Sequence, residues 1–162
     1  MKSPHITPIK INAGIITVSS TRTPDTDESG MRIHEIFDSA QIPTVYYAIV
    51  PDEINQIRNR LFEAEKTANC IVLNGGTGLT HDDCTIEAVS PLLEKKIDGF
   101  GEMFRQYSLR EIGTSAMLSR AVGGIRAGRA VFCIPGSTPA VTLAMKELIV
   151  PEVAHILSHA NR

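Results

Sequence analysis

The most informative segment of this chain runs from Leu73 to Thr85 and reads LNGGTGLTHDDCT. Glycines stand at positions 75, 76 and 78, directly after a short apolar run at residues 70–73. An apolar strand that ends in a glycine loop and leads into a helix is where open α/β proteins hold anions. Glycine lets the backbone approach a ligand closely, and the first turn of a helix offers unpaired N–H groups. The segment therefore predicts an α/β fold with a ligand site at this loop.

Two adjacent carboxylates, Asp82 and Asp83, follow the glycines. Side by side they repel a bare phosphate, but Mg²⁺ commonly binds one or two carboxylates together with substrate phosphates. One interpretation is therefore a site for a phosphorylated ligand with Mg²⁺. The other is a tight strand-to-helix turn with a solvated acidic rim, and these residues alone do not decide between the two.

Common phosphate-binding motifs do not account for the loop. A P-loop requires lysine and then serine or threonine after its last glycine, whereas Leu79 and Thr80 stand there. The dinucleotide fingerprint fails as well, because His81 occupies the place of its third glycine. These generic motifs therefore do not explain the loop.

Composition limits the classes of function. A chain of 162 residues with 43% apolar and 21% charged residues predicts one globular domain over residues 1–162, preceded by a loose arm at 1–8. The net charge of −2 gives no electrostatic case for nucleic acid or an anionic membrane, and no apolar run is long enough to span a bilayer. Three widely spaced cysteines predict free thiols in a reducing cytoplasm rather than a zinc site.

Apolar patterning predicts four strands, at residues 9–19, 44–50, 70–74 and 129–134, the first of them buried, with a small edge strand near 95–98. Helical patterns separate them, and this alternation predicts right-handed crossovers in a parallel sheet. In the common doubly wound order, strands one and three flank the crevice where ligands bind. The polar loop after the first strand, residues 19–30, should therefore face the glycine loop across one opening.

Several side chains have more than one interpretation. Ser29 and Asp52 each precede a helical pattern and can act as N-caps. Asp52 also stands at the carboxyl end of a strand, where it can instead share the crevice with Asp83. The helix expected at residues 99–113 should turn Met103, Phe104, Tyr107 and either Leu109 or Ile112 inward.

Four short motifs occur in a fixed order: GGTG at 75–78 with Asp83 five places on, GFGE at 99–102, LSR at 118–120 and PGS at 135–137. Each is weak alone, but the set is specific and resembles the MogA/MoaB family of molybdenum-cofactor biosynthesis. The likeness runs from about Ile15 to Val153. The segment FRQYSLREIGTSAMLSRAVGGI is most similar to the MoaB branch.

The resemblance implies a three-layer α/β/α fold around a mostly parallel sheet, assembled as a homotrimer or as two trimers. It implies binding of molybdopterin, the metal-free dithiolene pterin, through its terminal phosphate. It further implies transfer of AMP from ATP onto that phosphate, with Mg²⁺ present and pyrophosphate released. A downstream molybdate-inserting protein then uses adenylylated molybdopterin.

The resemblance also assigns roles to residues. Asp52 and Asp83 match the two carboxylates needed for adenylylation, and we expect them to hold Mg²⁺ against the ATP phosphates. Thr77 and Ser108 match positions that help to hold molybdopterin, although Ser108 otherwise fits a neutral surface residue of its helix. The substrate and nucleotide are expected to contact Gly75, Gly76, Thr77, Gly78, Ser108, Ser119, Pro135, Gly136 and Ser137.

This chain departs from many active relatives in two places, with Asp82 where they have arginine and Ile86 where they have proline. Aspartate in place of arginine exchanges a phosphate donor for a repelling charge. That change favours an alternative, a non-catalytic MoaB-like protein that binds molybdopterin. Asp52, which some inactive MoaB proteins lack, favours the enzyme. A structural scaffold is a third hypothesis, which nothing in the sequence recommends.

Overall fold

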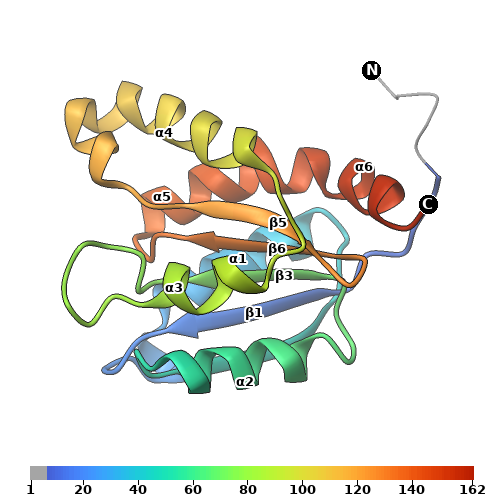
Figure 1. The fold of residues 1–162 in the computed structure, drawn as a ribbon, viewed down its shortest axis with the longest axis horizontal. Coiled ribbons are helices and arrows are strands. Elements are labelled where there is room, and N and C mark those ends of the chain that lie inside the picture. Colours follow the sequence, from blue (N-terminus) through green and yellow to red (C-terminus); the bar gives the residue numbers. More distant parts are fainter. Residues whose placement is uncertain (1–6) are drawn as a thin grey trace.

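The computed structural model describes residues 7–162 and contains one six-stranded sheet with helices on both faces (Figure 1). The order of the strands is β2-β1-β3-β6-β5-β4. Neighbouring strands from β2 to β6 are parallel, and only β5 runs against its two neighbours. The prediction of a mostly parallel sheet is confirmed. The strands are β1 (Ala13–Val18), β2 (Thr44–Val50), β3 (Cys70–Asn74), β4 (Lys95–Lys96), β5 (Val122–Arg126) and β6 (Arg129–Ile134).

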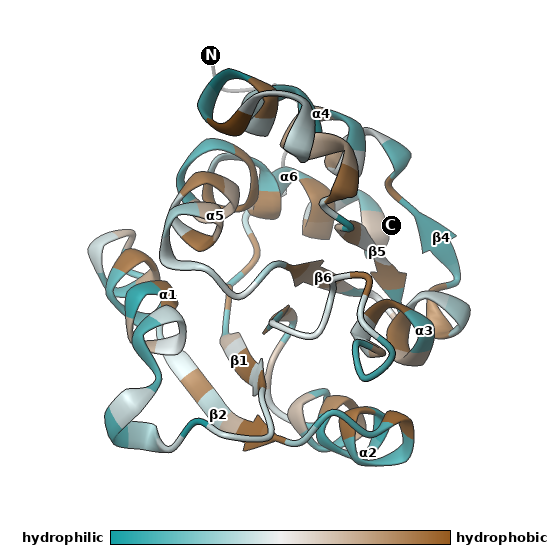
Figure 2. Ribbon diagram, turned by 90° about the vertical axis from the view of Figure 1, so that its left-hand side faces the viewer, coloured by the Kyte–Doolittle hydropathy of each residue, from teal (hydrophilic) through white to brown (hydrophobic). Residues whose placement is uncertain are grey.

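Helices form the outer two layers, as Figure 2 shows in a view down the strands. One face is covered by α1 (Glu28–Ser39), α4 (Asp98–Ile112), α5 (Thr138–Leu143) and α6 (Val150–Ala160). The other face is covered by α2 (Ile54–Ala64) and α3 (Thr85–Val89). Within residues 7–162, no helix combines the length and the apolar character that crossing a membrane requires. The predicted three-layer α/β/α arrangement is confirmed.

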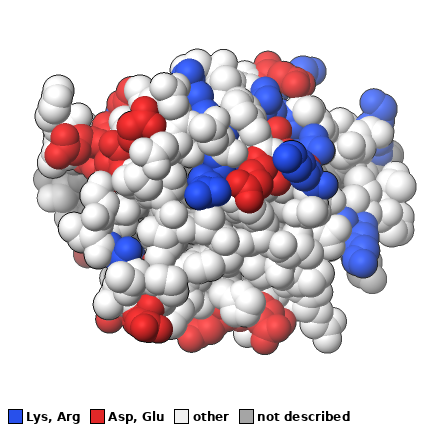
Figure 3. Space-filling view, turned by 90° about the horizontal axis from the view of Figure 1, so that it is seen from below, with Lys and Arg blue, Asp and Glu red and all other residues white. Residues whose placement is uncertain are grey.

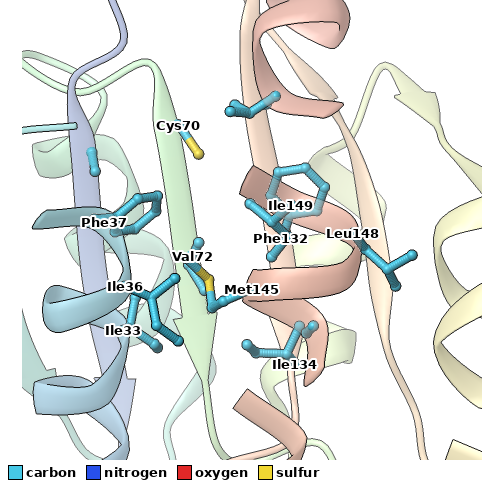
Figure 4. Packing of buried hydrophobic residues seen from close by; sticks show 14 of the residues in the cluster. Ile33, Ile36, Phe37, Cys70, Val72, Phe132, Ile134, Met145, Leu148 and Ile149 are labelled. Atoms are coloured by element: carbon cyan, nitrogen blue, oxygen red, sulfur yellow. The ribbon is translucent and has the colours of Figure 1, made fainter. Parts of the chain in front are cut away.

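Two apolar cores form because successive side chains of a strand point to opposite faces of the sheet. In β1, Ile15 joins the core under α1 and α5, whereas Ile16 joins the core under α2. In β6, Phe132 and Cys133 divide in the same way. Figure 4 shows the larger core, where side chains of α1 and of the helical segment after α5 (Ala144–Ile149) meet over β3 and β6. Burial on both faces explains why these strands are almost continuously apolar.

Truncation of Phe132 tests the larger core. Its side chain is 1% exposed, and its ring lies 5.0 Å from the ring of Phe100, between centroids. We expect Phe132→Ala to lower the free energy of unfolding by about 3–5 kcal/mol, because a large cavity would open beneath α4. Urea denaturation followed by circular dichroism measures this change. A loss below about 1 kcal/mol would show that the site collapses or is less well packed than described.

The strand order places the crevice where the sequence predicted it. β1 and β3 are neighbours, while β2 lies beyond β1 and β6 lies beyond β3, so the chain leaves the two central strands in opposite directions. Loops at the carboxyl ends of parallel strands diverge at such a switch point and leave an opening. Figure 2 looks onto this end of the sheet.

The structure corrects two predicted helix starts. Asp27, not Ser29, caps α1, and its carboxylate accepts a hydrogen bond from the N–H of Gly30. Glu53, not Asp52, caps α2 by accepting the N–H groups of the second and third helical residues. In both places a neighbouring carboxylate takes the role, since side-chain direction at the start of a helix decides which oxygen reaches the free N–H groups. Asp52 is thereby free to face the crevice.

One strand start differs from the prediction, and one strand was not predicted. β1 begins at Ala13 rather than residue 9, because its partners β2 and β3 begin opposite Ala13. β5 was missed, since Gly123 and Gly124 argue against a strand by composition. Close packing requires both glycines: a Cβ at Gly123 would lie 2.8 Å from the Phe132 ring, and one at Gly124 would lie 2.5 Å from the Lys95 carbonyl oxygen.

The predicted inner face of α4 is partly wrong. Phe104 is buried as expected, but Met103, Leu109 and Ile112 are exposed instead of facing inward. Ser108 is buried instead of lying on the surface. α4 packs on α5 and β5 along a face that begins with Phe100, which the apolar pattern did not reveal. We call the exposed residues of α4 and the following 3₁₀ turn (Gly113–Leu118) the apolar α4 surface; they are Met103, Leu109, Ile112, Met117 and Leu118.

The C-terminal helices form one continuous run rather than two. A π-helical segment, Ala144–Ile149, connects α5 directly to α6, and Pro151 is the second residue of α6. Proline is tolerated in the first turn of a helix, and π turns often occur where a helix carries an irregularity. The predicted loose arm at residues 1–8 lies mostly outside the described residues. Within it, the N–H of Thr7 donates to the Ser158 hydroxyl.

The outer side of α2 carries charges of both signs. Arg60 pairs with Glu63 at 2.9 Å, and Arg126 reaches Glu65 at 2.6 Å. Figure 3 views the molecule from the side that α2 covers and shows basic and acidic side chains close together there. Such interspersed pairs stabilise the surface only weakly. On this face they form no continuous basic area.

Candidate active site

Two adjoining cavities lie at the carboxyl edge of the sheet. The first, of about 410 Å³, is lined by the loop after β1, by Asp52 and by the start of the glycine loop. The second, of about 290 Å³, is lined by the rest of the glycine loop and by residues 118–120. Gly76, Asp83 and Gly136 line both cavities. The first cavity and the second cavity therefore share a wall.

The glycine loop is held tightly between β1 and β6. The N–H of Gly75 donates to the Ile134 carbonyl, and the Thr85 hydroxyl donates to the Gly75 carbonyl at 2.7 Å. Gly75 adopts a φ of 95°, and a Cβ there would lie 2.4 Å from the Val18 carbonyl oxygen. Only glycine combines this backbone conformation with so close an approach. The loop is thus a rigid part of the cavity wall.

Arg120 clamps the second half of the loop. Its Nε and Nη2 atoms donate to the carbonyl oxygens of Thr77 and Gly78, each at 2.9 Å. The same guanidinium pairs with Glu87, and this hydrogen bond lowers the pKa of the Glu87 carboxyl group. Ser119 and Arg120, the last two residues of the LSR motif, both line the second cavity, and Arg120 also holds the loop in place.

Asp52 and Asp83 both line the first cavity. The Oδ2 atom of Asp52 accepts a hydrogen bond from the Ser20 hydroxyl at 2.9 Å. The Oδ2 atom of Asp83 accepts bonds from the N–H and hydroxyl of Thr80, at 3.0 and 2.8 Å. Among residues 7–162, the Oδ1 atom of neither carboxylate accepts a hydrogen bond. Each aspartate is therefore held through one oxygen and keeps the other for a ligand.

The negative charges of both aspartates affect the pKa of the Cys84 thiol. Burial raises the pKa of this thiol first, and the negative charges of Asp52 and Asp83 are among the carboxylates that raise it further. Two residues 31 positions apart thus act on one neighbouring group. A concentration of negative charge at this edge of the sheet attracts cations.

The donor set suits a hard cation that arrives with its own ligands. Within the described part of the chain, no group of three or more His, Cys, Asp or Glu side chains could hold a metal ion. Two carboxylates with one available oxygen each match Mg²⁺, which is usually completed by phosphate oxygens and water. The residues present therefore fit Mg²⁺ bound together with a phosphorylated ligand.

Not every predicted site residue lies at the cavities. Ser137 is exposed and caps α5 by accepting the N–H of Ala140, and it lines neither cavity. Ser108 is buried on α4 and also lines neither. The other predicted residues do line them: Gly75 and Asp52 the first, Thr77, Gly78, Ser119 and Pro135 the second, and Gly76, Asp83 and Gly136 both.

Two observations at the rim bear on the departures from the family pattern. Asp82 is exposed and lines neither cavity, so its charge is not in the cavity walls. Arg22, which the sequence did not single out, is the one cationic side chain among the residues that line the first cavity. Its position at the carboxyl end of the first strand was the signal that could have identified it.

Comparisons with known proteins agree with this geometry. Residues 14–155 match the family described as a probable molybdopterin binding domain. The chain is 46% identical over 158 residues to molybdenum cofactor biosynthesis protein B of Bacillus cereus, covering 96% of this chain and 94% of that one. It is 47% identical over 153 residues to the protein of that name from Halalkalibacterium halodurans, covering 93% and 90%.

Solved structures give the same result. A crystal structure of a molybdenum cofactor biosynthesis protein B superimposes with a TM-score of 0.92 at 45% identity, covering 96% of this chain and 99% of the other. The tungsten cofactor synthesizing protein MoaB from Pyrococcus furiosus superimposes with a TM-score of 0.87 at 41% identity, covering 96% and 100%. The chain therefore belongs to the MogA/MoaB family of molybdenum-cofactor biosynthesis proteins.

Proposed function

We propose that this protein acts in molybdenum-cofactor biosynthesis by transferring AMP from ATP to the terminal phosphate of molybdopterin, with release of pyrophosphate. The observation that carries the proposal is the pair of adjoining cavities with a common wall. A transfer between two bound substrates requires two sites whose reacting ends meet. Gly76, Asp83 and Gly136 line both cavities and mark that meeting place.

The linings of the cavities suggest which substrate each takes. ATP suits the first cavity, since Asp52 and Asp83 can hold Mg²⁺ against its phosphates. The terminal phosphate of molybdopterin suits the second, where Thr77 and Gly78 offer backbone N–H groups and Thr77 and Ser119 offer hydroxyls. When bound, Mg²⁺ would supply positive charge that offsets the repulsion between two anionic substrates.

The reaction needs little covalent help from the protein. A phosphate oxygen of molybdopterin attacks the α-phosphorus of ATP, a new P–O bond forms, and the bond to the leaving pyrophosphate breaks. No general base is required, because the attacking phosphate is already ionised at neutral pH. The protein contributes positioning and charge, as in other phosphoryl transfers. The rigid glycine loop and the two anchored aspartates are suited to that task.

The alternative function is a molybdopterin-binding protein without transfer activity. Asp82 in place of arginine favours it, and the retained Asp52 with its free oxygen favours the enzyme. We also propose that the chain assembles as a homotrimer or a dimer of trimers and passes its product to a molybdate-inserting protein. The apolar α4 surface supports self-association, because it exposes five large apolar side chains from one helix and the turn that follows it.

A direct assay tests the proposal. Purified protein is incubated with molybdopterin, ATP and Mg²⁺, and we expect release of pyrophosphate together with adenylylated molybdopterin, identified by mass spectrometry. Chelation of Mg²⁺ by EDTA should abolish both products. Molybdopterin binding without pyrophosphate release, at any Mg²⁺ concentration, would contradict the transferase and support the alternative.

A further inference from the structure

Arg22 occupies an unusual place in the first cavity. It follows β1, its side chain is 35% exposed, and it lines the same cavity as Asp52 and Asp83. Its Nη1 atom donates to the Ser29 hydroxyl and lies 3.5 Å from the Asp27 carboxylate, and its Nη2 atom reaches the Gly136 carbonyl at 3.4 Å. The guanidinium is thus fixed at the cavity wall from two sides.

A buried polar network lies behind this guanidinium. The carboxylate of Asp27 is fully buried and accepts hydrogen bonds from the Tyr47 hydroxyl at 2.6 Å and from the N–H of Gly30 at 3.0 Å. Ser29 extends the network by donating to the side-chain oxygen of Asn74 at 2.7 Å. Asn74 in turn donates to the Thr17 hydroxyl. The network therefore ties the start of α1 to β1, β2 and β3.

Burial of an ionised carboxylate is costly unless it is paired and fully hydrogen-bonded. Asp27 meets that condition, with Arg22 as its cationic partner. A guanidinium has five N–H donors in a fixed planar fork, and the contacts to Ser29, Asp27 and Gly136 use only part of them. The remaining donors belong to a side chain that is already immobilised, so a ligand need not order it.

We propose that the first cavity is a polyphosphate subsite in which Arg22 binds the anion and Asp27 is the positioning residue that holds the guanidinium in place. Asp52 and Asp83 line the same cavity, so a bare anion is repelled there. A polyphosphate that carries Mg²⁺ satisfies both kinds of group, because the cation faces the aspartates and a phosphate oxygen faces Arg22. The identity of this ligand as ATP rests on the proposed function, whereas binding of the polyphosphate can be measured without it.

The test is calorimetric titration of Mg²⁺-ATP and Mg²⁺-pyrophosphate into the wild-type protein and into Arg22→Gln, Arg22→Lys and Arg60→Gln. We expect Arg22→Gln to weaken both ligands by at least about tenfold, since a charge-assisted hydrogen bond is lost. Arg22→Lys should recover part of the affinity, because the charge returns without the planar fork. Arg60→Gln is the control, since Arg60 lies on α2 and pairs with Glu63. Wild-type affinity in Arg22→Gln would overturn the inference.

Asp27→Asn tests the positioning role. It keeps the shape of the side chain, and thermal melting establishes that the variant is folded. We expect Mg²⁺-ATP to bind more weakly in calorimetry with unchanged molybdopterin affinity, which a general loss of structure would not produce. Equal losses for both ligands, or no change for either, would overturn the positioning role.

If Mg²⁺-pyrophosphate binds through Arg22 but no AMP is transferred, the transferase proposal fails and the subsite stands. If Arg22→Gln transfers AMP and binds Mg²⁺-pyrophosphate as the wild type does, the subsite at Arg22 fails and the transferase proposal stands.

Discussion

Replacing Asp83 by asparagine is expected to lower the rate of AMP transfer by about 100-fold or more, since removal of one electrostatic stabiliser at a reacting phosphate typically has this effect. Asparagine keeps an oxygen that can accept from the N–H and hydroxyl of Thr80, so the loop should keep its shape. The lost charge is then the only large change. Pyrophosphate release under saturating ATP and molybdopterin measures the effect.

Asp82→Asn is the matched control, because Asp82 is the adjacent carboxylate but lines neither cavity. We expect it to alter turnover by no more than about twofold, as surface substitutions usually change free energies by at most about 0.5 kcal/mol. Molybdopterin affinity should change far less than turnover in both variants. Near-normal turnover in Asp83→Asn would show that this carboxylate does not support the transfer, and an equal loss in both variants would show a general charge effect.

Gly75→Ala is expected to lower the free energy of unfolding by about 3 kcal/mol or more, because strain at an unfavourable φ and overpacking each cost about 1–3 kcal/mol. The new Cβ would meet the Val18 carbonyl oxygen at 2.4 Å, and this contact is with backbone rather than with a flexible side chain. The loop cannot shift away, since Gly136 backs onto Gly75 closely enough that its own Cβ would lie 3.0 Å from the Gly75 Cα.

Gly99→Ala provides the comparison for this second prediction. Gly99 lies in the first turn of α4, and a Cβ there would meet no atom within 4 Å. Its stability should be unchanged or raised by up to about 1 kcal/mol, since alanine favours helix over glycine. Urea denaturation of both variants in parallel measures the difference. Equal stability of Gly75→Ala and wild type would mean that the glycine loop is more compliant than its contacts indicate.

Local sequence patterns were sufficient to predict the strands and turns whose conformation depends on their own residues. The runs at 44–50 and 70–74 are strands with the predicted bounds. The run at 70–74 is apolar throughout because β3 is buried on both faces of the sheet, whereas β2 is a half-exposed edge strand that its β-branched and aromatic residues revealed. Glycines at 75 and 76 likewise predict a tight turn, because both adopt a positive φ that other residues rarely adopt. The α4 prediction failed at Met103 because periodicity identifies an apolar stripe but not which part of a wide stripe the neighbouring elements cover.

By itself, the order of strands, glycine turns and helices determined the parallel α/β architecture and the edge of the sheet at which a ligand can bind. Only the tertiary structure decided which side chains meet at that edge. Asp52 is free for the crevice because Glu53 caps α2, and Arg22 is fixed because Asp27 is buried against Tyr47. Both outcomes depend on contacts between residues of different elements. Such contacts exist only once β1, β2 and β3 lie side by side, so no local pattern encodes them.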